Sequence, residues 1–108
     1  MIEIRQYVDR LGRAPFERWL QGLDGTERAR IAIAIERLGA GNFSAVKSLG
    51  AGIHELRMNF GPGYRAYFGK DGEAIVILLG GGTKKWQQSD IEAARTLWQE
   101  YKRRKQGG

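Results

Sequence analysis

The stretch ELRMNFGPGYRAYFGKDGEAIVILLGGG, residues 55–82, decides the fold of this chain of 108 residues. It contains two turn signals, GPG at 61–63 and KDG at 70–72, and Asp-Gly is among the strongest short signals for a β-hairpin. Apolar and polar residues alternate around both turns, which is typical of strands. We therefore predict three consecutive antiparallel strands within residues 50–82.

The turns also predict which side chains share a face of the sheet. The apolar face should meet the helices, and its expected pairs are Phe60–Tyr64, Met58–Ala66 and Leu56–Phe68, with Ile75, Ile77 and Leu79 beside them. The opposite face should carry Glu55, Arg57, Asn59, Arg65 and Tyr67 above Val76 and Leu78. Arg57 and Arg65 are thus expected together, on the side turned away from the core.

Two positive side chains on neighbouring strands repel each other unless an anion lies between them. One interpretation is that Glu55 neutralises one arginine on an ordinary solvated face. The other is that the arginines bind an anionic ligand. The loop GGGTKK at 80–85 offers glycine amides and lysines that suit phosphate contacts, but it can equally be a plain connector. It lacks the strand–GxxxxGK–helix pattern of a nucleotide-binding P-loop.

Apolar residues at helical spacing predict two helices before the sheet. Pro15 suits the first turn of a helix, whose apolar stripe ends at Leu23. Thr26 is the expected N-cap of the second helix, which should end at about residue 39 where glycines follow. The alternating segment 2–8 predicts a first strand.

A capping box of Ser89 and Glu92 predicts the start of a last helix, and its apolar face runs from Ile91 to Tyr101. The expected order is therefore strand, two helices, three antiparallel strands and a C-terminal helix. We predict an α+β fold in a single domain over residues 1–108.

The composition restricts the cell compartment and the chemistry. The chain has no cysteine, which excludes disulfides and thiolate catalysis and fits a reducing cytoplasm. The N-terminus lacks the apolar core of a signal peptide, and the longest apolar run, AIVILL, is too short to cross a bilayer. We expect a cytoplasmic protein with no membrane partner. No His, Asp and Glu cluster has metal-ligand spacing, so neither a metal nor a cofactor is expected.

The net charge of +6, with a pI near 10.0, favours a polyanionic partner, most simply nucleic acid or the ribosome. A solubilising surface charge and an acidic protein partner are the alternatives. The sole histidine, His54, falls on the core side of its strand by alternation, so we expect it to be structural.

Two segments resemble a known family. LGAGIHELRMNFGPGYRAYF at 49–68 and ILLGGGTKKWQQSDIEAA at 77–94 are similar to the RelE/HigB-like toxins of bacterial type II toxin–antitoxin modules. They most closely resemble the subgroup called addiction module killer proteins, which is linked to phage Gp49-like proteins. The resemblance covers nearly the whole chain, with the motifs in the expected order.

This resemblance implies a RelE/ParE-like sheet with the helices packed on one face. It also implies a metal-independent mRNA endoribonuclease, acting in many members at the ribosome, that inhibits translation. Such toxins are neutralised by a cognate antitoxin, often a helix-turn-helix protein in this subgroup. Operator DNA is then contacted only through the antitoxin, when the complex represses its own promoter.

Matched position by position, the resemblance assigns catalytic roles to Arg65 in GYR, to Lys84 or Lys85 in GGTKK and to Arg57 in ELR. We expect Arg65 and Lys84 to stabilise the transition state and Arg57 to position the phosphate. Thr83 replaces the acid that is frequent in the subgroup, so the candidates for proton transfer are Tyr67 and Asp90. The expected RNA or ribosome contacts are Lys85, Lys47, Lys102, Arg103 and Arg104.

A rival interpretation is a binding protein without catalysis. ParE-like toxins share the fold but poison DNA gyrase, and a protein of phage origin could bind nucleic acid or protein alone. The basic loop and the basic tail would serve binding equally well.

Overall fold

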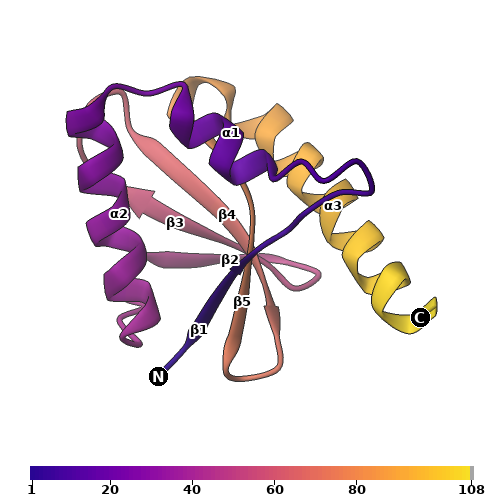
Figure 1. The fold of residues 1–108 in the computed structure, drawn as a ribbon. Helices are drawn as coiled ribbons and strands as arrows, with labels where there is room; N and C mark the ends of the chain where they lie inside the picture. The colour runs from indigo at the N-terminus through magenta and orange to yellow at the C-terminus, as the bar shows by residue number, and fades with distance from the viewer. Residues whose placement is uncertain (108) are drawn as a thin grey trace.

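A computed structural model describes residues 1–107 of the chain (Figure 1). The elements, in order, are β1 (Glu3–Gln6), α1 (Pro15–Gln21), α2 (Gly25–Gly39), β2 (Val46–Gly50), β3 (Ile53–Met58), β4 (Tyr64–Asp71), β5 (Ile75–Thr83), the short 3-10 helix η1 (Lys84–Trp86) and α3 (Gln87–Gly107). The sequence predicted all of these except β2 and η1. Within residues 1–107, no helix has the length and apolar character needed to cross a membrane.

The sheet has five strands in the order β1-β5-β4-β3-β2. Strands β3, β4 and β5 are antiparallel neighbours, as predicted, and β2 adds a further antiparallel strand beside β3. Strand β1 pairs with β5 in parallel, so the sheet is mixed. Strand β2 escaped prediction because it is a short edge strand whose pairing shifts at a bulge between Ser48 and Gly50.

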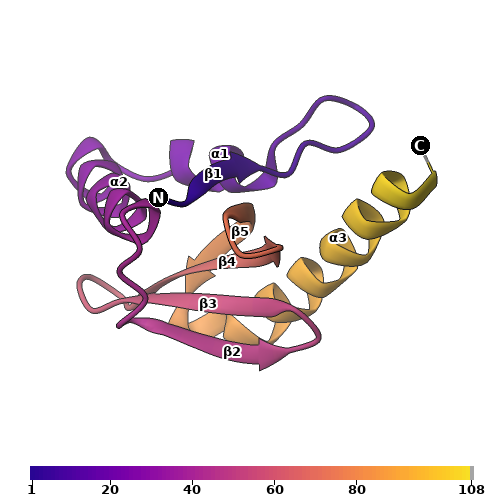
Figure 2. The same ribbon diagram turned by 90° about the horizontal axis from the view of Figure 1, so that it is seen from below.

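Helices cover both faces of the sheet, so the expectation that they all pack on one face is wrong. On one face, Phe16 of α1 and Ile31 and Leu38 of α2 pack with the apolar residues of β3, β4 and β5. On the other face, Ala94 and Trp98 of α3 pack with strand residues that include Tyr67. Figure 2 shows α1 and α2 on one side of the strands, while α3 begins on the opposite side. Helices are needed on both faces because the IVILL segment of β5 is apolar on both of its faces, and each face must be buried against a helix.

The register between β3 and β4 differs from the prediction by two residues. Met58 pairs with Tyr64, and Arg57 lies directly opposite Arg65. The loop includes Asn59 and Phe60 as well as the GPG segment. Because side chains alternate with a period of two, this shift leaves every face assignment of the two strands unchanged.

The face assignment of β5 is wrong, because the loop between β4 and β5 differs in length from the prediction by an odd number of residues. Asp71 pairs with Ile75, so the loop is one residue longer than the predicted two-residue turn. A slip of one residue exchanges the faces. Val76 and Leu78 therefore join the face that packs on α1 and α2, and Ile77 packs beneath α3.

The two predicted helix caps are also corrected. Asp24, not Thr26, is the N-cap of α2, and its carboxylate accepts a hydrogen bond from the Glu27 amide at 2.9 Å. The capping box at Ser89 does not form, because α3 already begins at Gln87. The Ser89 hydroxyl instead donates to the Trp86 carbonyl at 3.1 Å.

Candidate functional site

The register places the polar residues of β3 and β4 in two adjacent cross-strand rows. Arg57 pairs with Arg65, which pairs in turn with Gly82 of β5. In the next row, Glu55 pairs with Tyr67, and Lys47 of the edge strand β2 pairs with Glu55. The predicted grouping of Arg57 and Arg65 on one face is therefore confirmed, and the two residues lie closer than predicted. The prediction that this face is turned away from the core is wrong, because α3 covers it and Arg65 is buried there.

Glu55 resolves the repulsion between the two arginines. Its side chain is fully buried, and its Oε1 atom lies 2.7 Å from Nε of Arg65 and 3.7 Å from Nε of Arg57. The same oxygen accepts a hydrogen bond at 2.8 Å from the side-chain amide of Gln87 in the first turn of α3. Two guanidinium groups thus share one carboxylate, which leaves the pair with a net positive charge.

The two arginines differ in accessibility. The Arg57 side chain is 44% exposed, whereas that of Arg65 is 8% exposed. Lys84 joins them through Gly63, since a Cβ placed on Gly63 would lie 3.3 Å from Cβ of Lys84 and 3.7 Å from Nη1 of Arg65. The Lys84 amide also donates to the Gly63 carbonyl at 2.9 Å. The structure therefore brings together all three residues predicted to be catalytic, two of them exposed to solvent.

We call Arg57, Arg65 and Lys84 the cluster. Tyr67 and Asp90 lie beside it, in the layer beneath α3. Burial raises the pKa of the Tyr67 hydroxyl, the charges of Glu55 and Asp90 raise it further, and Arg65 opposes them. Burial also raises the pKa of the Asp90 carboxyl. That carboxyl packs against Gly82, where a methyl group in place of the hydrogen would collide with it. The site thus contains one hydroxyl that retains its proton and one carboxyl whose pKa lies above the usual aspartate value.

Three buried oxygens of this layer have no hydrogen-bond partner among the described residues. They are Oε2 of Glu55, the Tyr67 hydroxyl and Oδ2 of Asp90. An unsatisfied buried polar group costs about 1–3 kcal/mol, so most native proteins contain few of them. Their concentration under the first turn of α3 marks this layer as the candidate site.

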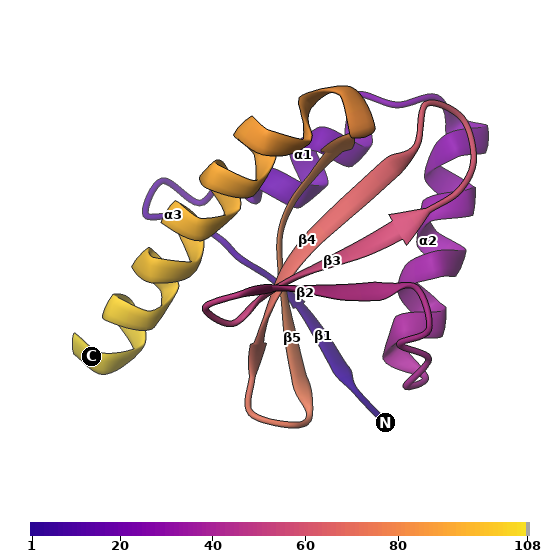
Figure 3. The ribbon, with the colours of Figure 1, turned by 180° about the vertical axis from the view of Figure 1, so that it is seen from behind.

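The remaining predicted contacts divide into two groups. Lys47 and Lys85 are exposed near the cluster, and the Lys85 ammonium lies 5.4 Å from the centre of the Trp86 ring. Lys102, Arg103 and Arg104 lie toward the other end of α3, about 22–26 Å from its first residue at 1.5 Å per residue. Figure 3 shows α3 running from the end of β5 to a C-terminus well away from α2. The structure therefore does not bring the basic tail to the cluster.

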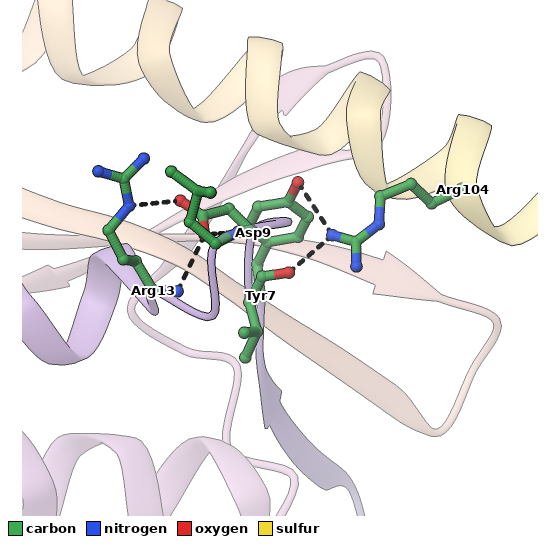
Figure 4. Close-up of polar contacts among 6 residues, drawn as sticks. Tyr7, Asp9, Arg13 and Arg104 are labelled. Carbon is green, nitrogen blue, oxygen red and sulfur yellow. Dashed lines mark hydrogen bonds and ion pairs between the residues drawn. The ribbon is translucent and has the colours of Figure 1, made fainter.

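Arg104 has internal partners, which sequence reasoning did not anticipate. It donates to the Val8 carbonyl at 2.7 Å and to the Tyr7 hydroxyl at 3.4 Å (Figure 4). The loop that it holds is ordered by Asp9, whose carboxylate accepts from the backbone amide and the side chain of Arg13. Arg104 thus ties the last turns of α3 to the segment that follows β1.

His54 lies on the other face, as predicted. Its ring stacks on Phe68 with the ring centres 5.3 Å apart, and burial lowers its pKa with a further contribution from Lys70. Within residues 1–107, no group of three or more His, Cys, Asp or Glu side chains is placed to hold a metal ion.

Sequence reasoning offered Glu55 as a partner for one arginine, but on a solvated face and not in its buried place, and it missed the role of Gln87. The signal for Glu55 was its position two residues before Arg57, which puts both on one strand face. The contact of Gln87 joins residues 32 positions apart and has no local signal.

One family model and one relative match this chain. The family model described as phage-derived protein Gp49-like (DUF891) matches residues 18–99. An uncharacterised protein of Haemophilus influenzae is 44% identical over 86 residues, which cover 79% of this chain and 87% of that protein. The family match includes strands β2–β5 and the first turns of α3, which carry the residues of the cluster. This chain belongs to the phage-derived Gp49-like protein family, which is associated with toxin–antitoxin modules.

Proposed function

We propose that this protein is the toxin of a type II toxin–antitoxin module and cleaves mRNA as a metal-independent endoribonuclease. It acts in the cytoplasm in association with ribosomes, and a cognate helix-turn-helix antitoxin neutralises it. The observation that carries this proposal is the charge of the cluster. Arg57 and Arg65 share one buried carboxylate beside exposed Lys84, so the cluster can accept a phosphate without displacing an equal negative charge.

RNA cleavage without a metal begins with attack of a ribose 2′-oxygen on the adjacent phosphorus. The bond from phosphorus to the 5′-oxygen of the next nucleotide then breaks, which gives a 2′,3′-cyclic phosphate and a free 5′-hydroxyl. Extra negative charge develops on the phosphate oxygens in the transition state. Arg57 and Lys84 are exposed and contact these oxygens, while Arg65 adds a positive charge from a buried position, where charges are screened less.

The reaction also moves two protons. Asp90 is the group best suited to exchange them, because burial raises its carboxyl pKa toward the range in which a carboxyl can both take and give a proton. The raised pKa of Tyr67 excludes it as a base and leaves it as a hydrogen-bond donor. His54 lies on the opposite face and takes no part.

The test is cleavage of mRNA by the purified protein, with and without translating ribosomes. Arg57→Ala is the decisive variant, because its exposed side chain can be removed without leaving Glu55 unpaired. We expect its rate to fall about 100-fold or more, as when other preorganised transition-state contacts are lost. Arg10→Ala, a change of the same type at an exposed position outside the cluster, should cleave at the wild-type rate. Equal rates for Arg57→Ala and wild type would contradict the proposal.

One observation favours a second candidate, a ParE-like toxin that binds without cleaving. Tyr67 and Glu55 are fully buried, and Arg65 nearly so, which limits direct contact with a substrate. This candidate predicts growth arrest with intact transcripts and an accumulation of gyrase–DNA breaks. The nuclease predicts cut transcripts and no such breaks.

A further inference from the structure

A groove of about 400 Å³ lies between α2 and the end of β3. The proposed chemistry uses Arg57 from its lining and nothing else. The lining residues are Arg30, Ile33, Ala34 and Arg37 of α2, Asn42, Ser44 and Ala45 of the next loop, and Leu56–Phe60.

The groove is positively charged and contains no counterion of its own. Arg30, Arg37 and Arg57 line it, and no carboxylate does. Within residues 1–107, neither Arg30 nor Arg37 forms an ion pair. The nearest partner of Arg57 is the Glu55 carboxylate at 3.7 Å, which Arg65 already holds at 2.7 Å. The groove therefore complements a negatively charged ligand.

The same groove is apolar between its charges. Ile33 is 48% exposed, one of few large apolar side chains so exposed, and it lies beside Ala34. Arg30, Ile33, Ala34 and Arg37 occupy positions i, i+3, i+4 and i+7 of α2, which form one face of a helix. The Cα atoms of the two arginines are about 10.5 Å apart along the axis, so the two cationic residues flank an apolar centre.

The aromatic residue of the groove cannot serve as a platform for bases. The Arg30 guanidinium lies 4.0 Å from the centre of the Phe60 ring, and the Tyr64 ring packs against Phe60 at 5.5 Å. Single-stranded RNA is held largely by stacking of bases on open aromatic faces. The combination of separated cations, an apolar centre and a covered ring favours a peptide over RNA.

We propose that this groove binds an acidic amphipathic helix of a protein partner, with carboxylates two turns apart on either side of apolar side chains. Such a helix would pair its carboxylates with Arg30 and Arg37 and bury its apolar residues on Ile33. The proposal rests on the proposed function only in naming the antitoxin as the natural partner.

The probe for the test is a fluorescein-labelled, alanine-rich peptide of about 16 residues, long enough for appreciable helicity. It carries two glutamates seven positions apart with two leucines between them. Its affinity for the full chain is measured by fluorescence anisotropy. The double variant Arg30→Glu/Arg37→Glu should lose affinity by about tenfold or more, because close charge pairs across an interface are strongly coupled. A version of the peptide with lysines in place of the glutamates should prefer this variant to the wild type.

The control is Arg10→Glu/Arg18→Glu, which makes the same change in net charge at exposed arginines outside the groove. It should change the affinity by less than about twofold. Equal losses in the two double variants would show attraction by bulk charge and overturn the proposal. So would failure of the wild type to bind the acidic peptide, or displacement of the peptide by a single-stranded RNA of 12 nucleotides from Arg57→Ala, which lacks the proposed phosphate contact.

Measurement of mRNA cleavage separates this proposal from the nuclease proposal. The variant Arg30→Glu/Arg37→Glu should cleave at the rate of the charge-matched control Arg10→Glu/Arg18→Glu while losing the peptide. If the wild type binds the peptide but does not cleave mRNA, the nuclease proposal is wrong and the peptide-binding proposal is supported. If the wild type cleaves mRNA but does not bind the peptide, only the peptide-binding proposal is wrong.

Discussion

The two faces of the sheet are built on different principles. Beneath α1 and α2, the face is apolar, and Ile31, Leu38 and Phe68 are fully buried there. Beneath α3, apolar residues share the layer with the charged pair of Glu55 and Arg65 and with three unpartnered oxygens. Burial of apolar surface explains most of the first face, where one oxygen, Oε2 of Glu27, has no hydrogen-bond partner among the described residues. The second face costs stability, and such costs are typical of functional sites.

The largest expected effect comes from removing one member of the buried ion pair. Arg65→Ala leaves the Glu55 carboxylate buried beside a single, exposed arginine, so we expect a loss of about 3–5 kcal/mol in the free energy of unfolding. Arg57→Ala should lose no more than about 1 kcal/mol, because the Arg57 side chain is itself exposed and its contact with Glu55 is long. Urea denaturation measures both. Similar losses would mean that the two arginines are equivalent.

The adjacent glycines of β5 allow a direct comparison of the two faces. A methyl group at Gly81 would collide with the Trp19 ring, and one at Gly82 with the Asp90 carboxyl. Trp19 is held between Phe16 and Tyr64, whereas the Asp90 side chain can rotate. We expect Gly81→Ala to cost about 3 kcal/mol and Gly82→Ala about 1 kcal/mol.

The double variant Gly82→Ala/Asp90→Ala is the control, and it should recover the loss caused by Gly82→Ala. If Gly82→Ala costs as much as Gly81→Ala, the layer beneath α3 is packed as rigidly as the apolar face.

Two aspartates should give pH dependences of opposite sign. The pKa of Asp90 is raised by burial above the ordinary value of 3.8, so the folded state binds a proton more tightly than the unfolded chain. Its contribution to stability is therefore lost as pH rises from 3.8 through the raised pKa. Hydrogen bonds from Lys105 and Tyr101 lower the pKa of Asp71, so its contribution is present above 3.8 and is lost as pH falls through the lowered pKa.

The comparison is measured by urea denaturation of the wild type, Asp90→Asn and Asp71→Asn between pH 3 and pH 7. As pH falls, the wild type should gain stability relative to Asp90→Asn and lose it relative to Asp71→Asn. Slopes of the same sign would contradict the assignment of Asp90 to a desolvated layer.

The smallest expected changes in the free energy of unfolding come from removing the hydroxyl groups of two tyrosines, and they should have opposite signs. The Tyr67 hydroxyl has no partner among the described residues, so Tyr67→Phe should raise the free energy of unfolding by about 1 kcal/mol. The Tyr101 hydroxyl donates to Asp71 at 2.6 Å, and Tyr101→Phe should lower it by a similar amount. A destabilised Tyr67→Phe would mean that this hydroxyl is satisfied in solution.

Local patterns in the sequence predicted the elements other than β2 and η1, and they predicted the shared face of the arginines. Arg57 and Arg65 were placed correctly although the register was displaced, because a shift of two residues preserves alternation. Ile75 and Val76 were assigned to the wrong faces of the sheet, because one additional loop residue reverses the alternation of side chains. Local patterns therefore predicted the strands, but they did not predict the length of each turn, and the turn length decides which face each side chain occupies.

The burial of the site could not be predicted from such patterns. Arg65 is buried only because α3 crosses the face beneath it, and that crossing follows from the apolar residues on both sides of β5. The bond between Gln87 and Glu55 depends on the same crossing. Contacts of this kind depend on tertiary packing, which overrides local preference.

The parallel pairing of β1 with β5 joins the beginning of the chain to its last strand. Glu3 lies beside Ile75, a separation of 72 residues (75 − 3), so β1 has no strand neighbour until β5 has been translated. Such distant contacts slow folding, because a long stretch of chain must first be ordered. The Gln87 contact comes later still in translation. A growing polypeptide on the ribosome therefore carries no complete cluster with its anchoring contacts before Gln87 has been added.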